Sequence, residues 1–459
     1  MKRPGIVLPM VLFSMFWVSP LPVSTSYAQS VNWAKRYNGP GNWEESPAAI
    51  AVDALGNVYV TGGSYGAGPD HYNSDYATIK YNADGKQLWV KRYNGPGNGE
   101  DSPRALAADA QGNVYVTGAS PGKGSSFDYA TIKYSPSGKR LWVRRYNGPG
   151  NGHDAAAALA VDLKGNVYVT GASLGADSGY DFVTIKYSPS GERLWLRRYN
   201  GVGNGHDAAT ALAVDPKGNV YATGSTEENG VGEDYCNYAT VKYSAGGKLL
   251  WAKTYNGPGN RHDAACAIGV DLQGNAYVTG GSAGADYIDY ADYATIKYDP
   301  GGKQLWVRRY NGPGKDADQP HALVVDGEGN AYVTGYSVGA STYHDYATVK
   351  YDPTGKRLWV RRYNGPLNDS ENASALALDA KGNVYVTGAS SGKGSSSDYT
   401  TLKYSPSGER LWLKRYNNPE DGWDGARCIA VDADGHVYVT GSSFRVGSGN
   451  DYVTIKYNQ

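Results

Sequence analysis

The sequence predicts an all-β fold: an eight-bladed β-propeller with four antiparallel strands per blade, closed by the N-terminal strand, which completes the last blade. Three observations support this prediction. A tetrapeptide of the form Tyr-Val-Thr-Gly recurs every 53 to 56 residues. Each unit holds four short segments of strand character, separated by turns rich in glycine. The two ends of the repeat region complement each other, because the last unit lacks the segment with which the first begins.

The N-terminus carries a segment that we expect to lie outside the fold. Two basic residues precede an uncharged apolar stretch over residues 6–18, and two small residues, the second at Ala28, suit a signal peptidase. This layout is typical of a secretory signal and is short for a membrane span. We therefore expect a signal peptide over residues 1–28 and a single propeller domain over residues 29–459. The product is expected to be exported to the periplasm, the extracellular space or the cell surface, and not to span a membrane.

Each unit reads as four strands in a fixed order. The first has the form Ala-Leu-Ala-Val-Asp, as at residues 158–162, and the next three have the forms Asn-Val-Tyr-Val-Thr-Gly, Asp-Tyr-Ala-Thr-Ile-Lys-Tyr and Leu-Trp-Val-Arg-Arg-Tyr. Tyrosine, valine, threonine and tryptophan suit a pleated, half-buried surface. Tight turns of the forms Asp-x-x-Gly-Asn and Ser-Pro-Ser-Gly join the strands in pairs. Four antiparallel strands, repeated about eight times, are typical of a propeller.

The ends of the repeat region set the number of blades. The region opens at Trp33 inside a fourth segment and stops at Tyr457 after a third segment. We expect residues 31–37 to complete the blade that residues 451–457 leave unfinished, because this pairing removes two sheet edges. In the first segment, small residues alternate with large ones, as expected for a strand packed between blades near a crowded axis.

These repeats resemble the bacterial β-propeller repeat family called SBBP. The likeness covers essentially residues 31–459 and is most specific in Gly-Asn-Val-Tyr-Val-Thr-Gly followed by Asp-Tyr-Ala-Thr-Ile-Lys-Tyr. The family name presumes seven blades, whereas this chain holds eight. The resemblance implies an exported or surface protein, in a family with few assigned activities. A weaker likeness to quinoprotein repeats, at residues 137–142, implies an eight-bladed ring in which a tryptophan docks each blade on its neighbour.

Charge and cysteine content restrict the possible partners. The chain carries 44 basic and 44 acidic residues, and 42 basic residues face 44 acidic ones once the leader is removed. A nucleic-acid binder carries a net basic footprint, so we expect no nucleic-acid partner. The three cysteines lie in three different units and do not make a disulfide framework. We expect a monomer stabilised by its core.

Repeated aromatic and basic residues are expected to build the scaffold. One tryptophan recurs in each fourth segment: Trp33, Trp89, Trp142, Trp195, Trp251, Trp306, Trp359 and Trp412. A basic residue follows each of them by two positions. We interpret the tryptophans as contacts between blades and the cations as protection of an outer sheet edge against aggregation. A basic binding belt is the alternative.

A ring of carboxylates is the candidate metal site. Eight acidic residues lie at one repeat position, just before the innermost strand: Glu45, Asp101, Asp154, Asp207, Asp263, Asp318, Glu371 and Asp424. Carboxylates around one axis would suit calcium, which prefers oxygen ligands. Alternatively, each carboxylate caps its own Gly-Pro-Gly-Asn loop through backbone N–H groups. Identical repetition favours the capping role, so we expect no cofactor and keep calcium as the weaker hypothesis.

Binding residues are expected where the repeat breaks its own pattern. The connections that enter the first strands and those that join second to third strands share one face, and loops on a rigid scaffold often carry recognition. Six off-pattern residues of adjacent blades on this face form the candidate binding site: Trp43, Trp423, Tyr65, Tyr72, Phe444 and Arg445. Exposed aromatic side chains stack on sugar rings or peptide side chains. Packing within the loops is the alternative.

Two functions are compatible with these features. No Gly-x-Ser-x-Gly, His-Glu-x-x-His or phosphate-cradling motif stands out, and fold alone supplies no function. The favoured hypothesis is a non-enzymatic binding or scaffold protein whose loop-rich face meets a protein or carbohydrate partner. The alternative is a propeller enzyme, either a quinoprotein-like oxidoreductase or a carbohydrate-active protein.

Overall fold

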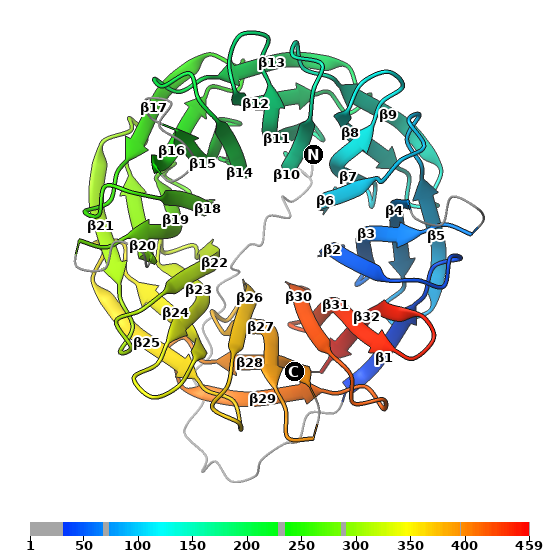
Figure 1. The fold of residues 1–459 in the computed structure, drawn as a ribbon, viewed down its shortest axis with the longest axis vertical. Helices are drawn as coiled ribbons and strands as arrows, with labels where there is room; N and C mark the ends of the chain where they lie inside the picture. The colour runs from blue at the N-terminus through cyan, green and yellow to red at the C-terminus, as the bar shows by residue number, and fades with distance from the viewer. Residues whose placement is uncertain (1–30, 68–72, 228–234, 286–290, 395, 459) are drawn as a thin grey trace, which may run out of the picture.

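The computed structural model describes residues 31–67, 73–227, 235–285, 291–394 and 396–458. In these ranges the chain forms eight four-stranded antiparallel sheets arranged as blades around a central axis (Figure 1). The predicted eight-bladed propeller is therefore confirmed. The expected leader over residues 1–28 lies outside the described residues.

Every blade runs from an innermost strand at the axis to an outermost strand at the rim (Figure 1). The innermost strands are β2 (Glu45–Val52), β6 (Ser102–Ala108), β10 (Asp154–Val161), β14 (Asp207–Val214), β18 (Asp263–Val270), β22 (Asp318–Val325), β26 (Glu371–Leu378) and β30 (Asp424–Val431). The second strands are β3 (Val58–Tyr65), β7 (Val114–Pro121), β11 (Val167–Leu174), β15 (Val220–Glu227), β19 (Ala276–Ala283), β23 (Ala331–Val338), β27 (Val384–Ser391) and β31 (Val437–Arg445).

The outer half of each blade holds the third and fourth strands. The third strands are β4 (Ser74–Tyr81), β8 (Phe127–Tyr134), β12 (Tyr180–Tyr187), β16 (Cys236–Tyr243), β20 (Ala291–Tyr298), β24 (His344–Tyr351), β28 (Ser397–Tyr404) and β32 (Gly449–Tyr457). The fourth strands are β5 (Gln87–Tyr93), β9 (Arg140–Tyr146), β13 (Arg193–Tyr199), β17 (Leu249–Tyr255), β21 (Gln304–Tyr310), β25 (Arg357–Tyr363), β29 (Arg410–Tyr416) and β1 (Val31–Tyr37). Blades 1 to 7 are continuous in sequence, starting with β2–β5.

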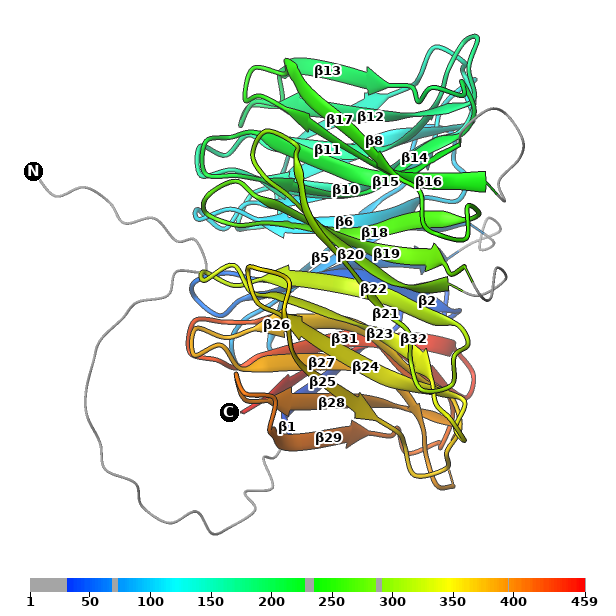
Figure 2. The same ribbon diagram turned by 90° about the vertical axis from the view of Figure 1, so that its left-hand side faces the viewer.

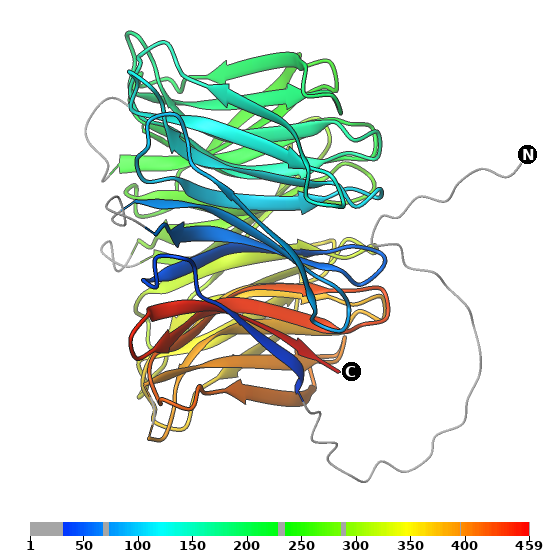
Figure 3. The same ribbon diagram turned by 90° about the vertical axis from the view of Figure 1, so that its right-hand side faces the viewer.

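Blade 8 combines the two ends of the repeat region. Its strand order is β1-β32-β31-β30, and β1 pairs antiparallel with β32, for example Ala34 with Ile455 and Tyr37 with Tyr452. Figure 3 shows β1 lying along β32 where the two colours of the chain ends meet. The predicted closure by residues 31–37 is therefore confirmed, and it covers the outer edge of β32 with a fourth strand.

Apolar cores lie between adjacent blades, and the outer-strand tryptophan is central to each. Trp142 is 8% exposed, and its Nε1 donates to the carbonyl of Pro189 in the next blade at 3.2 Å. Its ring covers the turn glycine Gly191, where φ is 83° and a Cβ would come within 2.9 Å of the indole. This turn therefore requires glycine for its backbone conformation and for its contact with the ring. Equivalent bonds join Trp33 to Ala83, Trp89 to Pro136, Trp195 to Ala245, Trp251 to Pro300, Trp306 to Pro353 and Trp359 to Pro406.

The basic residue that follows the tryptophan takes part in the same contact where it is an arginine. The Nε of Arg144 donates to the carbonyl of Gly191 at 2.5 Å, and its guanidinium lies 5.8 Å from the centre of the Trp142 ring. Arg197 and Arg308 make the same bond to their own neighbouring blades. At these positions the cation forms a hydrogen bond with the next blade. Neither the interpretation as protection of a sheet edge nor the alternative of a basic binding belt predicted this contact.

Closure generates a testable prediction. Deleting residues 1–37 should lower the melting temperature markedly and promote aggregation, because the edge of β32 and the docking site for Trp33 are both left open. Deleting only residues 1–30, which preserves β1, is the matched control. The measurement is thermal unfolding together with light scattering, and equal melting temperatures for the two truncations would refute a stabilising role for β1.

Candidate functional site

One face of the propeller carries the connections from second to third strands and from each blade to the next. We call it the loop-rich face; the outer strands point toward it, on the right in Figure 2. The opposite face carries the tight turns. All carboxylates of the predicted ring and all described members of the predicted aromatic site lie at the loop-rich end of their strands or in its connections.

The carboxylate ring is buried at the start of the innermost strands. Each member is the first residue of its strand or, for Asp101, the residue before it, and each is at most 1% exposed. Asp154 accepts hydrogen bonds from the backbone N–H groups of Gly148 at 2.6 Å and Leu174 at 3.1 Å. Gly39, Gly95, Gly201, Gly257, Gly312 and Asn418 donate in the same way to the ring members of their blades. These are the contacts that the capping interpretation expects.

A polar chain connects each ring member to the rim. In blade 2, Asp101 shares a hydrogen bond with Ser120, whose Oγ accepts from Arg145 NH1 at 2.6 Å. The same arginine forms an ion pair with Asp128 at 2.8 Å and donates to the hydroxyl of Tyr93 in blade 1 at 3.0 Å. Because arginine neutralises one carboxylate and bonds to the adjacent blade, the chain joins charge balance to blade docking. Corresponding ion pairs occur in every blade except blade 4, among the described residues.

Burial raises the pKa of all eight ring carboxylates, including the two glutamates. Burial raises the pKa of both Glu45 and Glu371 to about 7, and a nearby carboxylate of the preceding blade, Asp451 or Asp345, raises it further. In each of these pairs one oxygen of the glutamate and one of the aspartate are buried without a hydrogen-bond partner among the described residues. A proton on each glutamate removes the repulsion between the two buried carboxylates.

The predicted aromatic site is partly assembled at the junction of blades 8 and 1. Trp43 and Trp423 are 49% and 45% exposed, and each lies in the connection that enters its blade. Both connections bond to the hairpin between β31 and β32: Asn42 Nδ2 donates to the carbonyl of Gly447 at 2.8 Å, and Phe444 N donates to the carbonyl of Trp423 at 2.9 Å. The hairpin therefore links the two loops that carry the tryptophans.

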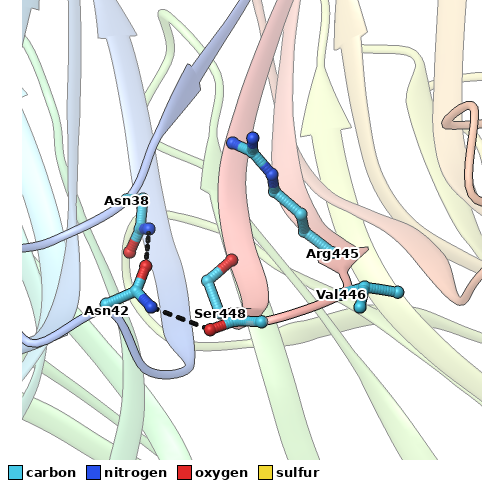
Figure 4. Close-up of a pocket in the computed structure, with 6 residues that line it drawn as sticks. Asn38, Asn42, Arg445, Val446 and Ser448 are labelled. Carbon is cyan, nitrogen blue, oxygen red and sulfur yellow. Dashed lines mark hydrogen bonds between the residues drawn. The ribbon is translucent and has the colours of Figure 1, made fainter.

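A shallow pocket lies beside this hairpin. Its volume is about 340 Å³, and it is lined by Asn38, Asn42, Arg445, Val446, Gly447 and Ser448. Figure 4 shows the two asparagines on the blade 1 side and Arg445, Val446 and Ser448 on the hairpin of blade 8. Polar donors and acceptors thus surround a recess one residue away from Trp43.

The remaining predicted residues are less closely associated with the pocket. Phe444 packs against Gly422, where a Cβ would lie 2.4 Å from its ring, so it supports the Trp423 loop. Tyr65 ends β3 in blade 1, and burial together with Glu100 raises its pKa above the usual value. Tyr72 lies outside the described residues.

Sequence reasoning missed a group of contacts in blades 3 to 5 on the same face. His153, His206 and His262 share one repeat position, and each meets the first residue of the preceding blade's third strand. The ring centres of Phe127 and His153 lie 4.8 Å apart, and Cys236 Sγ lies 2.9 Å from His262 Nδ1. Pairing that position with the start of the third strand one blade earlier would have revealed these contacts.

The Cys236–His262 pair does not present an activated thiolate. Burial raises the pKa of the Cys236 thiol to about 11, so the cysteine is protonated at neutral pH.

A further group of ring contacts lies in blade 6. The ring centre of Tyr336 is 5.6 Å from that of His321 and 4.3 Å from that of His344. The residues equivalent to Tyr336 in the other blades are glycine, alanine or serine.

No helix among the described residues is long and apolar enough to cross a membrane.

The two glutamates predict a pH dependence of stability. Their pKa in the folded protein, about 7, exceeds the ordinary value of 4.5, so their contribution is complete below pH 4.5 and is lost as the pH rises through 7. The melting temperature should therefore fall between pH 5 and pH 8. Glu45→Gln with Glu371→Gln should flatten this fall, because glutamine keeps the neutral form. If the melting temperature of the double variant fell with pH as steeply as that of the wild type, the raised pKa of the two glutamates would be contradicted.

Calcium provides a separate test of the ring. Added calcium should leave the melting temperature unchanged if the carboxylates only cap their loops.

Comparison with known proteins agrees with this architecture. The SBBP beta-propeller repeat model matches residues 195–230 and 305–341. An uncharacterized WD repeat-containing protein of Acanthamoeba polyphaga mimivirus is 26% identical over 439 residues, covering 86% of this chain and 29% of that protein. The chain thus spans less than a third of the length of this curated relative.

Two solved structures are also similar to this chain, at low sequence identity. The beta-propeller domain of the Trilobed protease from Pyrococcus furiosus is 9% identical with a TM-score of 0.44, over 82% of this chain and 100% of that domain. The WD40 domain of SCAP from fission yeast is 11% identical with a TM-score of 0.44, over 91% and 96% of the two chains. The chain is thus an eight-bladed β-propeller, and two of its stretches are similar to the SBBP beta-propeller repeat.

Proposed function

We propose that this protein is an exported, non-enzymatic binding protein whose loop-rich face meets a protein or a carbohydrate. The observation that carries the proposal is the pair of half-exposed tryptophans, Trp43 and Trp423, on two loops joined by one hairpin. Tryptophan supplies a large apolar surface with a polar N–H group, and such residues contribute much of the energy at recognition sites.

The rest of the scaffold supports this location by exclusion. Seven of the eight repeated tryptophans bond to the next blade, and the ring carboxylates bond to their own loops. These side chains are occupied by the fold and are poor positions for recognition. Trp43 and Trp423, by contrast, break the repeat and lie beside a recess lined by asparagine, arginine and serine. Such a mixture of an aromatic surface with amide and guanidinium groups suits the hydroxyl groups of a sugar or the backbone of a peptide.

The absence of enzymatic activity is part of the proposal. Cys236 is protonated at neutral pH, and no catalytic motif stands out in the sequence. Export rests on the leader pattern of residues 1–28. We expect a mature N-terminus at or near Gln29, determined by sequencing the exported protein, and no quinone absorbance after incubation with quinone and dialysis. An uncleaved cytoplasmic product would contradict export, and a retained quinone chromophore would favour the oxidoreductase alternative.

Binding is tested by truncating both tryptophans. Trp43→Ala with Trp423→Ala should weaken binding of a ligand found on glycan and peptide arrays by about 30-fold or more, because loss of a hot spot costs about 2 kcal/mol. The melting temperature should change little, since both side chains are about half exposed. Leu55→Ala is the matched control: it removes an 81% exposed apolar side chain in the tight turn of blade 1, on the opposite face. Marked destabilisation with intact binding would mean that the tryptophans only pack their loops.

A further inference from the structure

The tight turn between β30 and β31 departs from the other seven turns of its kind. Blades 1 to 7 all have the pattern Asp-x-x-Gly-Asn at this turn, as in Asp109-Ala-Gln-Gly-Asn113 of blade 2. Blade 8 instead has Asp432-Ala-Asp-Gly-His436. Relative to blade 2, exactly two side chains differ, and both changes introduce groups that coordinate metal ions.

The common turn uses both oxygens of its aspartate internally. In blade 2, Asp109 Oδ1 accepts from the backbone N–H groups of Gln111 and Asn113. Its Oδ2 accepts from Asn113 Nδ2 at 2.8 Å and from the Tyr115 hydroxyl at 2.9 Å. The asparagine is a donor here, and its Nδ2 is not a metal ligand. The bond from the asparagine to the aspartate recurs in all seven of these turns, at 2.6 to 2.8 Å.

Blade 8 replaces this donor by an imidazole nitrogen. His436 Nδ1 lies 2.9 Å from Asp432 Oδ2, and the imidazole is 31% exposed whereas the carboxylate is 9% exposed. Asp434 occupies the place of Gln111, and one ligand atom from each of Asp432, Asp434 and His436 lies within 4.8 Å of the other two. Two metal–ligand bonds of about 2.1 Å in a tetrahedral site separate their ligand atoms by about 3.4 Å, so a bound ion would replace the hydrogen bond that joins His436 to Asp432.

The carboxylate of Asp432 is held in place within the turn. Its Oδ1 accepts from the backbone N–H of His436 at 2.8 Å, and its Oδ2 accepts from the Tyr438 hydroxyl at 2.9 Å. The turn of blade 8 therefore keeps the fixed carboxylate of the other turns and places an imidazole beside it.

We propose that Asp432, Asp434 and His436 bind a divalent transition-metal ion such as Zn²⁺ on the face opposite the loop-rich face. One imidazole nitrogen and two carboxylate oxygens suit zinc, with water completing its coordination. This inference is independent of the proposed binding function, because it concerns other residues on the other face. The other seven turns all lack the histidine, and one of them, in blade 6, has a carboxylate, Glu328, at the place of Asp434.

The experiment compares the full mature protein with Asp434→Gln/His436→Asn. This double variant reproduces the turn of blade 2, which already folds in the same chain. Calorimetric titration with Zn²⁺ should show one fewer bound equivalent in the variant, and Zn²⁺ should raise the melting temperature of the wild type more than that of the variant. His153→Ala, which removes an exposed histidine on the loop-rich face, should retain the equivalent.

Crystals grown with Zn²⁺ supply the second measurement. An anomalous peak about 2.1 Å from a ring nitrogen of His436 is expected in the wild type and should vanish in the variant. Equal zinc stoichiometry and affinity in wild type and double variant, or zinc bound only at other histidines, would overturn the proposal. If the double variant unfolds, His436→Asn alone provides the same comparison, because asparagine is the residue of the other seven turns.

Discussion

The docking of each outer-strand tryptophan on the next blade is the interaction on which this structure depends. A four-stranded sheet has two faces to cover, and a propeller blade can cover them only with its neighbours. The indole of Trp142 closes one such seam by packing on Gly191 and bonding to Pro189. Because each apolar core forms between two adjacent blades, an open row of blades would leave one face of each end blade exposed to solvent. Pairing of β1 with β32 supplies the last tryptophan, Trp33, and lets the row close into a ring.

The same constraint explains the polar chains that run from rim to axis. Arg145 pairs with Asp128 of its own blade and bonds to Tyr93 of the preceding blade, so its charge is balanced where the blades meet. The ring carboxylates then hold the connection that leads from one blade to the next. Blade 4 shows how these positions depend on each other: Thr254 stands in place of the arginine, and Asn237 stands in place of the aspartate. Loss of the cation is thus matched by loss of the anion, as expected when an unpaired buried charge is costly.

Departures from the repeat occur at both ends of blade 8, where the two ends of the repeat region meet. Its loop-rich end carries Trp423, Phe444 and the hairpin that bonds to the Trp43 loop, while its opposite end carries Asp434 and His436. The pocket and the proposed metal ligands both lie in turns and loops, where residues outside the packing contacts are free to differ from blade to blade.

Fold, blade number and closure were determined by the sequence alone, because the repeat period, the strand patterns and the complementary ends all depend on local residues. The candidate Trp43 and Trp423 loops were likewise predictable, since both break the repeat and enter adjacent blades. Only the tertiary structure decided which side chains meet across a seam. It paired Cys236 with His262, placed Glu45 beside Asp451, and turned the cations that follow the tryptophans onto the next blade. These contacts join residues of different blades, and their distances depend on the rotation between neighbouring sheets, which no single repeat encodes.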